Sequence, residues 1–277
     1  MVLAECLRIL FPQWQGSGRE KYLYYSAIEI RDNFLPEFCY EQIDVDLEDE
    51  FTIKNDILGY DSIMLQLKKA VHLLSESKPN KIFTIGGDCG VELAPVSYLN
   101  RYYNGDLAVI WFDAHGDLNT PLVSPSKNFH GMPLRSLLGD GDENIIGQCF
   151  SSLVPNQIIL VGCRELDLPE KEYICENNIQ IFSANEMKDL DLFIHAVRAK
   201  GFSNLYVHLD LDVLDPECFP AVMCSAGNGI TLENLMRSLK ILKKQFNLVG
   251  FSTVEYKQNN DECMEKLREI IEYGYSL

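Results

Sequence analysis

Short apolar runs alternate with amphipathic segments along most of this 277-residue chain. The runs are four to seven residues long and rich in Val, Ile, Leu and Phe, and they lack the polar alternation of half-exposed strands. Such runs are typical of strands that are buried on both faces of a sheet. The predicted strands are Leu7–Phe11, Lys81–Ile85, Leu107–Phe112, Gln157–Val161, Ile179–Phe182, Leu205–Leu209 and Leu248–Val254.

The segments between these runs carry apolar residues at helical spacing. One pattern runs from Ile57 to Leu74 and another from Leu232 to Leu242, where Thr231 is a candidate N-cap. A third helix is predicted to open at Pro169 and to run to about Asn177. Alternation of strands and helices predicts an α/β fold with a parallel sheet and helices on both faces. Because no repeat or linker divides the sequence, residues 1–277 are expected to form one domain.

Composition excludes several function classes. The formal net charge of −17 argues against nucleic-acid binding, which needs clustered Lys and Arg, and suits a small cationic ligand. No stretch approaches the roughly 18 to 20 apolar residues that a membrane helix requires, and the N-terminus does not resemble a signal peptide. The nine cysteines are scattered singly, as expected for thiols in a reducing compartment, so a cytoplasmic location is predicted.

Acidic residues, a histidine and a cysteine follow the predicted strands. In parallel α/β sheets the ligand crevice lies beyond the carboxyl ends of the strands, so these side chains are expected to meet there. Crowded carboxylates repel one another unless cations neutralise them, and Asp with His suits a divalent ion such as Mn²⁺. A lone DxD is more often a turn or a helix cap, but several such segments at one sheet edge favour a metal site. The residues are Cys89, Asp113, His115, Asp117, Asp210, Asp212 and Glu255.

Four motifs, GGDCG, DAHGDLNTP, NFHGMP and HLDLDVLDP, precede Glu255 in an order and spacing that resemble the ureohydrolase family. That family comprises arginases, agmatinases and formiminoglutamases, and the resemblance, strongest to arginases, covers roughly residues 85–255. It implies a three-layer α/β/α fold with a central, mostly parallel sheet. It also implies two divalent metal ions, expected to be Mn²⁺, that share a bridging hydroxide.

The resemblance assigns roles to the candidate residues position by position. Asp113 and Asp210 would bridge the two ions. Cys89 and Asp117 would complete the coordination of one ion, and His115 and Asp212 would complete that of the other. Asp117 would also pass a proton from the bridging hydroxide to the leaving amine. Glu255 would orient the guanidinium group through a charge-assisted pair, and His130 would act as a proton shuttle at the mouth of the site.

The loop NTPLVSPSKNFHG resembles the arginase version of this segment. The resemblance implies that Asn119, Ser126 and Asn128 hold the α-carboxylate of the substrate and that Asp167 holds its α-amino group. These Ser and Asn residues are also common turn formers, so each taken alone has a structural explanation. Together they favour hydrolysis of L-arginine to L-ornithine and urea.

Two departures from the family pattern leave alternatives open. Cys89 stands where the family carries a histidine ligand, and a soft thiolate would weaken that site for Mn²⁺ or change its metal preference. Cys224 stands where a threonine helps to place the guanidinium group. The substrate could therefore be a related compound such as N-hydroxy-L-arginine, agmatine or formiminoglutamate, or the chain could be a non-catalytic relative with reduced metal binding. Whether the chain forms a homo-oligomer also stays open.

Overall fold

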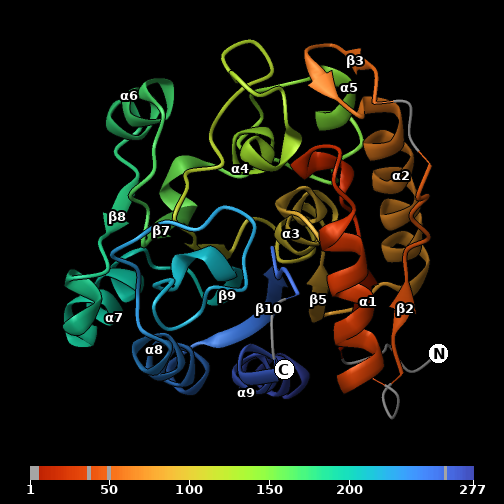
Figure 1. Ribbon diagram of the computed structural model, residues 1–277. Helices are drawn as coiled ribbons and strands as arrows, with labels where there is room; N and C mark the ends of the chain where they lie inside the picture. Colours follow the sequence, from red (N-terminus) through yellow and green to blue (C-terminus); the bar gives the residue numbers. More distant parts are fainter. Residues whose placement is uncertain (1–5, 36–38, 49–50, 259–260) are drawn as a thin grey trace.

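Eight parallel strands form the central sheet of the protein in a computed structural model, which describes residues 6–35, 39–48, 51–258 and 261–277 (Figure 1). Every pairing within this sheet is parallel. A separate antiparallel pair joins β3 (Ile53–Lys54) to β4 (Ile57–Leu58). Across the main sheet the order is β2 (Glu41–Gln42), β1 (Leu7–Phe11), β5 (Ile82–Gly86), β10 (Asn247–Val254), β9 (Asn204–Asp210), β6 (Leu107–Phe112), β7 (Ile158–Val161) and β8 (Gln180–Phe182).

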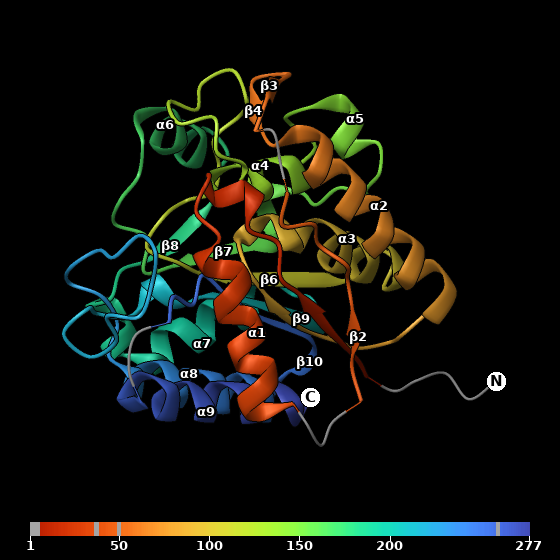
Figure 2. The same ribbon diagram turned by 45° about the vertical axis from the view of Figure 1, so that its right-hand side comes forward.

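Helices cover both faces of the sheet, which gives three layers (Figures 1 and 2). One face packs against α1 (Tyr22–Phe34), α7 (Leu190–Ala199), α8 (Leu232–Gln245) and α9 (Asp261–Tyr275). The other packs against α2 (Tyr60–Ser77), α3 (Leu93–Tyr102), α4 (Pro133–Leu137), α5 (Glu143–Ile146) and α6 (Leu168–Glu176). The predicted three-layer α/β/α fold is confirmed. Within the part of the chain that the structure describes, no helix is long and apolar enough to cross a membrane.

Neighbouring residues of a central strand belong to different cores. On β6, Ile110 and Phe112 join the core beneath α7 and α8, whereas Val109 and Trp111 join the core beneath α2 and α3. Because successive side chains of a strand point to opposite faces, both must be apolar when both faces are covered. This double burial explains why the strand sequences show no polar alternation.

The starts of α8 and α2 can be compared with the starts that the sequence predicts. Thr231 caps α8 by accepting a hydrogen bond from the Asn234 backbone N–H at 3.3 Å, as its sequence position predicts. The helix predicted from Ile57 begins later than expected, because Ile57 lies in β4 and α2 begins at Tyr60. Between them, Gly59 adopts φ 69°, a left-handed conformation that glycine takes without steric cost and that turns the chain into the helix.

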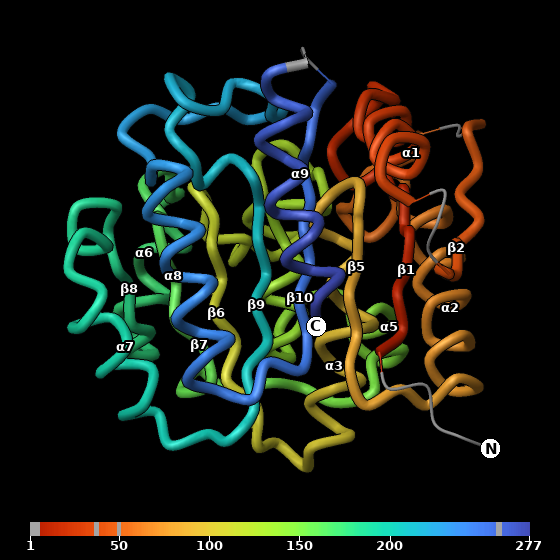
Figure 3. Tube along the Cα trace, turned by 90° about the horizontal axis from the view of Figure 1, so that it is seen from below, coloured from red at the N-terminus to blue at the C-terminus, as the bar shows by residue number. Residues whose placement is uncertain are grey.

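The strand order places the candidate site. Strands β5, β10, β9 and β6 are consecutive neighbours at the middle of the sheet, and the chain leaves each of them at the same edge (Figure 3). Cys89, Glu255, Asp210 and Asp113 each follow or end one of these four strands. Segments that are up to 166 residues apart, Cys89 and Glu255, are thereby brought to one crevice.

Gly87 allows the close backbone approach at the start of this crevice. Its N–H donates to the Phe11 carbonyl at 2.9 Å, and the next N–H, of Asp88, donates to the Gln13 carbonyl at 2.8 Å. A Cβ at Gly87 would lie 1.8 Å from the Gln13 carbonyl oxygen, where no contact of this kind is tolerated.

We expect Gly87→Ala to lower the free energy of unfolding by more than about 3 kcal/mol, because the carbonyl belongs to the backbone and β1 and β5 must separate to admit the methyl group. Urea denaturation followed by circular dichroism measures this loss. Gly227→Ala is the matched control, since nothing lies within 4 Å of a Cβ there. Equal midpoints for the two variants would contradict the close packing described here.

Candidate metal centre

Two aspartates and one histidine form the outer donor group, which we define as Asp113, His115 and Asp212. The Nδ1 atom of His115 lies 2.9 Å from Asp212 Oδ2 and 3.4 Å from Asp113 Oδ1. Backbone N–H groups hold both carboxylates, since that of Ala114 donates to Asp212 Oδ1 at 2.9 Å and that of His115 donates to Asp113 Oδ1 at 2.7 Å. One donor atom from each residue lies within 4.8 Å of the others, close enough to share one ion.

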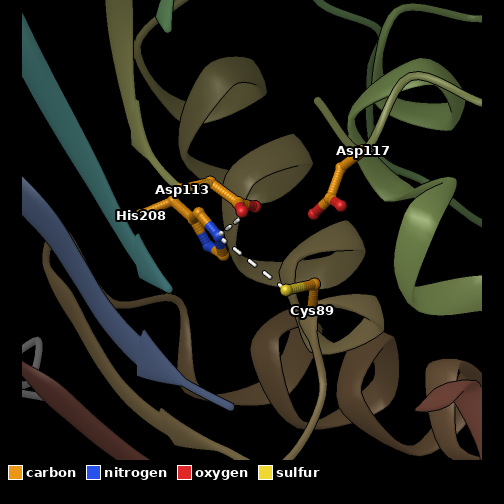
Figure 4. Close-up of side chains that lie close together, drawn as sticks. All are labelled: Cys89, Asp113, Asp117 and His208. Carbon is orange, nitrogen blue, oxygen red and sulfur yellow. Dashed lines mark hydrogen bonds and ion pairs between the residues drawn. The ribbon is translucent and has the colours of Figure 1, made fainter. Parts of the chain in front are cut away.

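A second set of donors lies deeper, and we define it as the inner donor group: Cys89, Asp113, Asp117 and His208 (Figure 4). All four residues are buried, and their donor atoms also lie within 4.8 Å of one another. A third overlapping set joins Cys89, Asp210 and Glu255, in which the Cys89 thiol donates to Asp210 Oδ2 at 3.2 Å. Because the sets share Asp113 and Cys89, they form one continuous cluster that offers donors for more than one ion. All six predicted metal ligands lie in this cluster.

His208 belongs to the inner donor group but was not predicted from the sequence. It lies two residues before Asp210 on β9, and side chains two apart on a strand point to the same face. That periodicity was the available signal, because it places His208 beneath Asp210 on the site's side of the strand. The histidine was overlooked because it precedes the end of the strand, where α/β ligands are usually sought.

The electrostatics of the cluster fit bound cations. Burial, and then repulsion from neighbouring carboxylates, raises the pKa of Asp117 and of Asp210 well above the usual range. Burial alone would also raise the pKa of Asp113, but the hydrogen bonds from His115 together with the charges of His115 and His208 outweigh burial, and the pKa of Asp113 is lowered. Asp117 Oδ2 and Glu255 Oε2 are buried without a hydrogen-bond partner. Oxygen atoms left in this state are costly unless a cation or its water occupies the space between them, so the donor set fits divalent metal.

The metal-free protein is expected to lose stability as pH rises from about 5 to about 8. Burial raises the pKa of Asp88 to about 7 and that of Asp212 to about 6, so the folded state keeps protons that the unfolded chain has released. Although burial opposes it, pairing with Asp113 and Asp212 raises the pKa of His115, and the stability from that shift is also lost as pH rises. The lowered pKa of Asp113 changes the free energy of unfolding only at more acidic pH.

Thermal unfolding in a chelating buffer across this pH range measures the slope. Asp88→Asn removes one of the raised carboxyl groups and is expected to flatten the dependence near pH 7. A metal-free protein whose melting temperature rises through this range would show that the buried carboxylates do not carry the assigned protons.

A cavity of about 340 Å³ opens above the cluster. Seven carboxylates line it: Asp117, Glu165, Asp167, Glu170, Asp210, Asp212 and Glu255. The lining also includes His115, His130, Asn119, Ser126, Cys89 and Cys224. This volume is at the lower end of small-molecule sites, and the lining is suited to a small cation.

Of the four candidate substrate contacts, three line this cavity. Asn119 donates from Nδ2 to Asp167 Oδ2 at 3.0 Å, and Ser126 lies nearby on the same loop. Asn128 is not among the lining residues, and its backbone N–H donates to Ser126 Oγ at 3.2 Å. His130 Nδ1 lies 3.3 Å from Glu255 Oε1, so two of the three predicted catalytic residues already form a pair.

Local backbone geometry aims two of the acidic side chains. Asp117 has φ 53° and Glu255 has φ 62°, a left-handed conformation that is uncommon for residues with a side chain. The surrounding structure holds both: the Asp117 carbonyl accepts from the Arg135 N–H at 3.1 Å, and the Glu255 N–H donates to the Gly87 carbonyl at 2.8 Å. Strained residues of this kind concentrate at functional sites, where the surrounding contacts stabilise them.

Arg164 and Glu170 fix the loops around the cavity. The Arg164 guanidinium donates to the carbonyls of Asp212 and Ala226 at 2.8 Å each, which ties the DLD segment to the loop that carries Cys224. Glu170 accepts from the N–H of Leu118 at 2.9 Å and from that of Asp167 at 2.8 Å. The cluster and the cavity walls are therefore connected by charge-assisted hydrogen bonds.

A model of the arginase family matches residues 25–267 of this chain. The chain belongs to the arginase family. An arginase from Staphylococcus aureus (strain MRSA252) is 31% identical over 236 residues, which cover 78% of each chain. An arginase from Entamoeba histolytica is 32% identical over 189 residues, 66% of this chain and 64% of the relative. The predicted family and the predicted class of enzyme, an arginase-like ureohydrolase, are confirmed.

Solved structures of the family share the fold. The crystal structure of Entamoeba histolytica arginase in complex with L-ornithine superposes with a TM-score of 0.85 at 24% identity and covers 98% of both chains. Formimidoylglutamase from Bacillus subtilis gives a TM-score of 0.74 at 19% identity and covers 98% of this chain and 86% of the other. Because an arginase and a formimidoylglutamase share this architecture, these structural matches show the fold alone, and the substrate has to be argued from the site.

Proposed function

We propose that this protein hydrolyses L-arginine to L-ornithine and urea with two divalent metal ions. The observation that carries the proposal is the continuous cluster of buried Asp, His and Cys donors at the floor of an acidic cavity. A guanidinium group is cationic and planar and presents a fork of N–H donors, which matches a cavity walled by carboxylates. The complex of Entamoeba histolytica arginase with L-ornithine, the amine product of this reaction, adds support.

Bound metal supplies a water of lowered pKa as the nucleophile and stabilises the charge that develops at the guanidinium carbon. The side chains of the protein position the substrate and transfer the proton. Glu255 is proposed to pair with the guanidinium group, displacing its present partner His130. The bond from the water oxygen to the guanidinium carbon forms and the bond from carbon to the ornithine nitrogen breaks. Asp117 Oδ2, buried and without a hydrogen-bond partner, is placed to accept the water's proton and pass it to the leaving nitrogen.

The amino-acid end of the substrate is proposed to bind along the opposite cavity wall. The Asp167 carboxylate offers an acceptor for the α-ammonium group, and its hydrogen bond from Asn119 holds it in place. Asn119, Ser126 and Asn128 are proposed to bind the α-carboxylate, and Asn128 would act from beyond the present cavity lining. His130, half-buried at the cavity, is proposed to act as a proton shuttle between the site and solvent.

For the metals, we propose Mn²⁺ at the outer donor group, whose oxygen and imidazole donors it accepts readily. We also propose that residues 1–277 act as one ureohydrolase-type domain in the cytoplasm. The free thiols of Cys89, Cys163 and Cys224 support this location, because disulfides are rare in reducing compartments. No nucleic-acid or membrane partner is proposed, and a homo-oligomer is compatible with the proposal.

Product release from metal-loaded protein tests this function over four substrates: L-arginine, N-hydroxy-L-arginine, agmatine and formiminoglutamate. We expect kcat/KM for L-arginine to exceed that for agmatine by at least about ten-fold, because agmatine lacks the α-carboxylate and leaves the buried Asn119 without that partner. A higher value for N-hydroxy-L-arginine would instead support the modified-guanidine alternative, in which the Cys224 side of the cavity accepts the added oxygen. No product from any of the four, with metal bound, would overturn the proposed function.

A further inference from the structure

The ring of His208 presents one nitrogen to the inner donor group. Its Nε2 atom lies 3.9 Å from Asp113 Oδ2 and 4.0 Å from Cys89 Sγ (Figure 4). The first distance is too long for a hydrogen bond, and the second is the outer limit for a contact with sulfur. The fully buried imidazole of His208 therefore faces the Asp113 carboxylate and the Cys89 thiol without a close hydrogen bond to either. Spacing of this kind is what a central ion needs from its ligands.

The rest of the ring is held in place by a shell of buried groups. Trp111 is the strand neighbour of His208, and the two rings stack with centroids 3.6 Å apart and planes inclined by 21°. On the far side, His208 Nδ1 lies 3.2 Å from Glu92 Oε1, near enough for an ion pair but not aligned as a hydrogen bond. Glu92 is in turn anchored by the Tyr206 hydroxyl, which donates to its Oε2 at 2.7 Å.

This shell has the composition found around histidine ligands of metals. A ligating imidazole typically gives its second ring N–H to a buried carboxylate, which fixes the tautomer and raises the basicity of the nitrogen on the metal. Here Glu92 faces Nδ1, which leaves Nε2 free to bind.

We propose that His208 is a metal ligand and that, together with Cys89, it makes the inner site a nitrogen- and sulfur-containing centre that selects a zinc-class ion over Mn²⁺. This inference rests on the proposed function, because it takes the cluster to bind metal. The donors would be one thiolate, one imidazole and the carboxylates of Asp113 and Asp117. Soft and borderline donors of this kind favour Zn²⁺ and Co²⁺, whereas Mn²⁺ prefers oxygen.

The X-ray absorption spectrum of wild-type protein loaded with two equivalents of Zn²⁺ tests the ligands without any substitution. We expect one sulfur neighbour for every two zinc ions, at about 2.3 Å, and two imidazoles for every two zinc ions, from His115 and His208. A spectrum with no sulfur and only one imidazole per two ions would overturn the inference while leaving the proposed function intact. Absence of bound zinc and manganese alike would overturn both.

Affinity measurements on two variants provide the second test. His208→Asn, too short to reach the ion, is expected to weaken Zn²⁺ at one of the two sites by about 100-fold and to leave the other within about threefold. Cys89→Ser is expected to narrow the preference for Zn²⁺ over Mn²⁺ by at least about ten-fold. The exposed residues His195 and Cys175 give the matched controls His195→Asn and Cys175→Ser, which should match wild type. Wild-type affinities in His208→Asn would show that the histidine only packs against Trp111.

Discussion

In the Asp117→Asn variant, kcat for L-arginine is expected to fall by about 10² to 10⁴-fold at saturating metal. The amide cannot accept the proton that the attacking water releases and cannot return it to the leaving nitrogen. Asp117 Oδ2 is buried and has no hydrogen-bond partner, so this oxygen is available to accept the proton. Steady-state urea release at several metal concentrations separates the loss of proton transfer from any weakening of the inner site.

Asp191→Asn is the matched control for this substitution. Asp191 is exposed on α7, away from the cavity, and the same change from carboxylate to amide should leave kcat at the wild-type value. An Asp117→Asn enzyme within threefold of wild type, with both ions bound, would contradict the proton-transfer role. The metal centre would then have to work without this carboxylate.

Removal of metal is expected to abolish urea release and to lower the melting temperature by about 10 °C or more. One ion at a hundred times its Kd stabilises the folded state by about 2.7 kcal/mol, so two ions contribute about 5 kcal/mol. For a chain of this size each kcal/mol corresponds to about 2–4 °C. The physical cause is the relief of repulsion among buried carboxylates, in which Asp113 takes part in both the inner and the outer donor group.

Differential scanning fluorimetry with a chelator, and then with metal restored, measures this shift. Asp113→Asn should lose most of the metal-dependent stabilisation, because one substitution removes a donor from both groups. Asp191→Asn should keep all of it. Melting temperatures that do not respond to chelation or to added metal in the wild-type protein would contradict a buried metal centre.

The sheet could be predicted from the sequence because its strands are buried on both faces. A run such as Leu107–Phe112 is short for a helix and typical of a strand covered on both faces, and the structure places it at the middle of the sheet. The site followed from the same reasoning, since acidic residues after buried strands meet at one edge. The strand order, in which β5, β10, β9 and β6 are neighbours, came from the structure, because single-sequence patterns do not reveal which strands pair.

The inner site was predicted only in part, for a physical reason. His208, Glu92 and Tyr206 are buried polar residues inside segments that otherwise read as hydrophobic core, and their partners are more than a hundred residues away in sequence or on another strand. Asn128 illustrates the converse, because its motif position predicted a substrate contact, yet it does not line the cavity. Motifs identify residue types at strand ends, whereas the side chains beneath them become apparent only when the strands are packed.

The structure changes the interpretation of Cys89, because it shows which side chains surround the sulfur. In the sequence it is a departure that weakens the prediction of a metal site. In the structure its sulfur lies 3.2 Å from Asp210 Oδ2 and 4.0 Å from an imidazole nitrogen, within a buried set of four possible ligands. The substitution is therefore compatible with a metal centre of altered preference as well as with a lost one.

Counting metal in the purified protein tests the central claim most directly. Protein loaded with divalent metal and then dialysed against metal-free buffer would be analysed by inductively coupled plasma mass spectrometry. Retention of two ions per chain is the predicted result, with one ion at the outer and one at the inner donor group. Less than one ion per chain, from a sample that remains folded, would contradict the account.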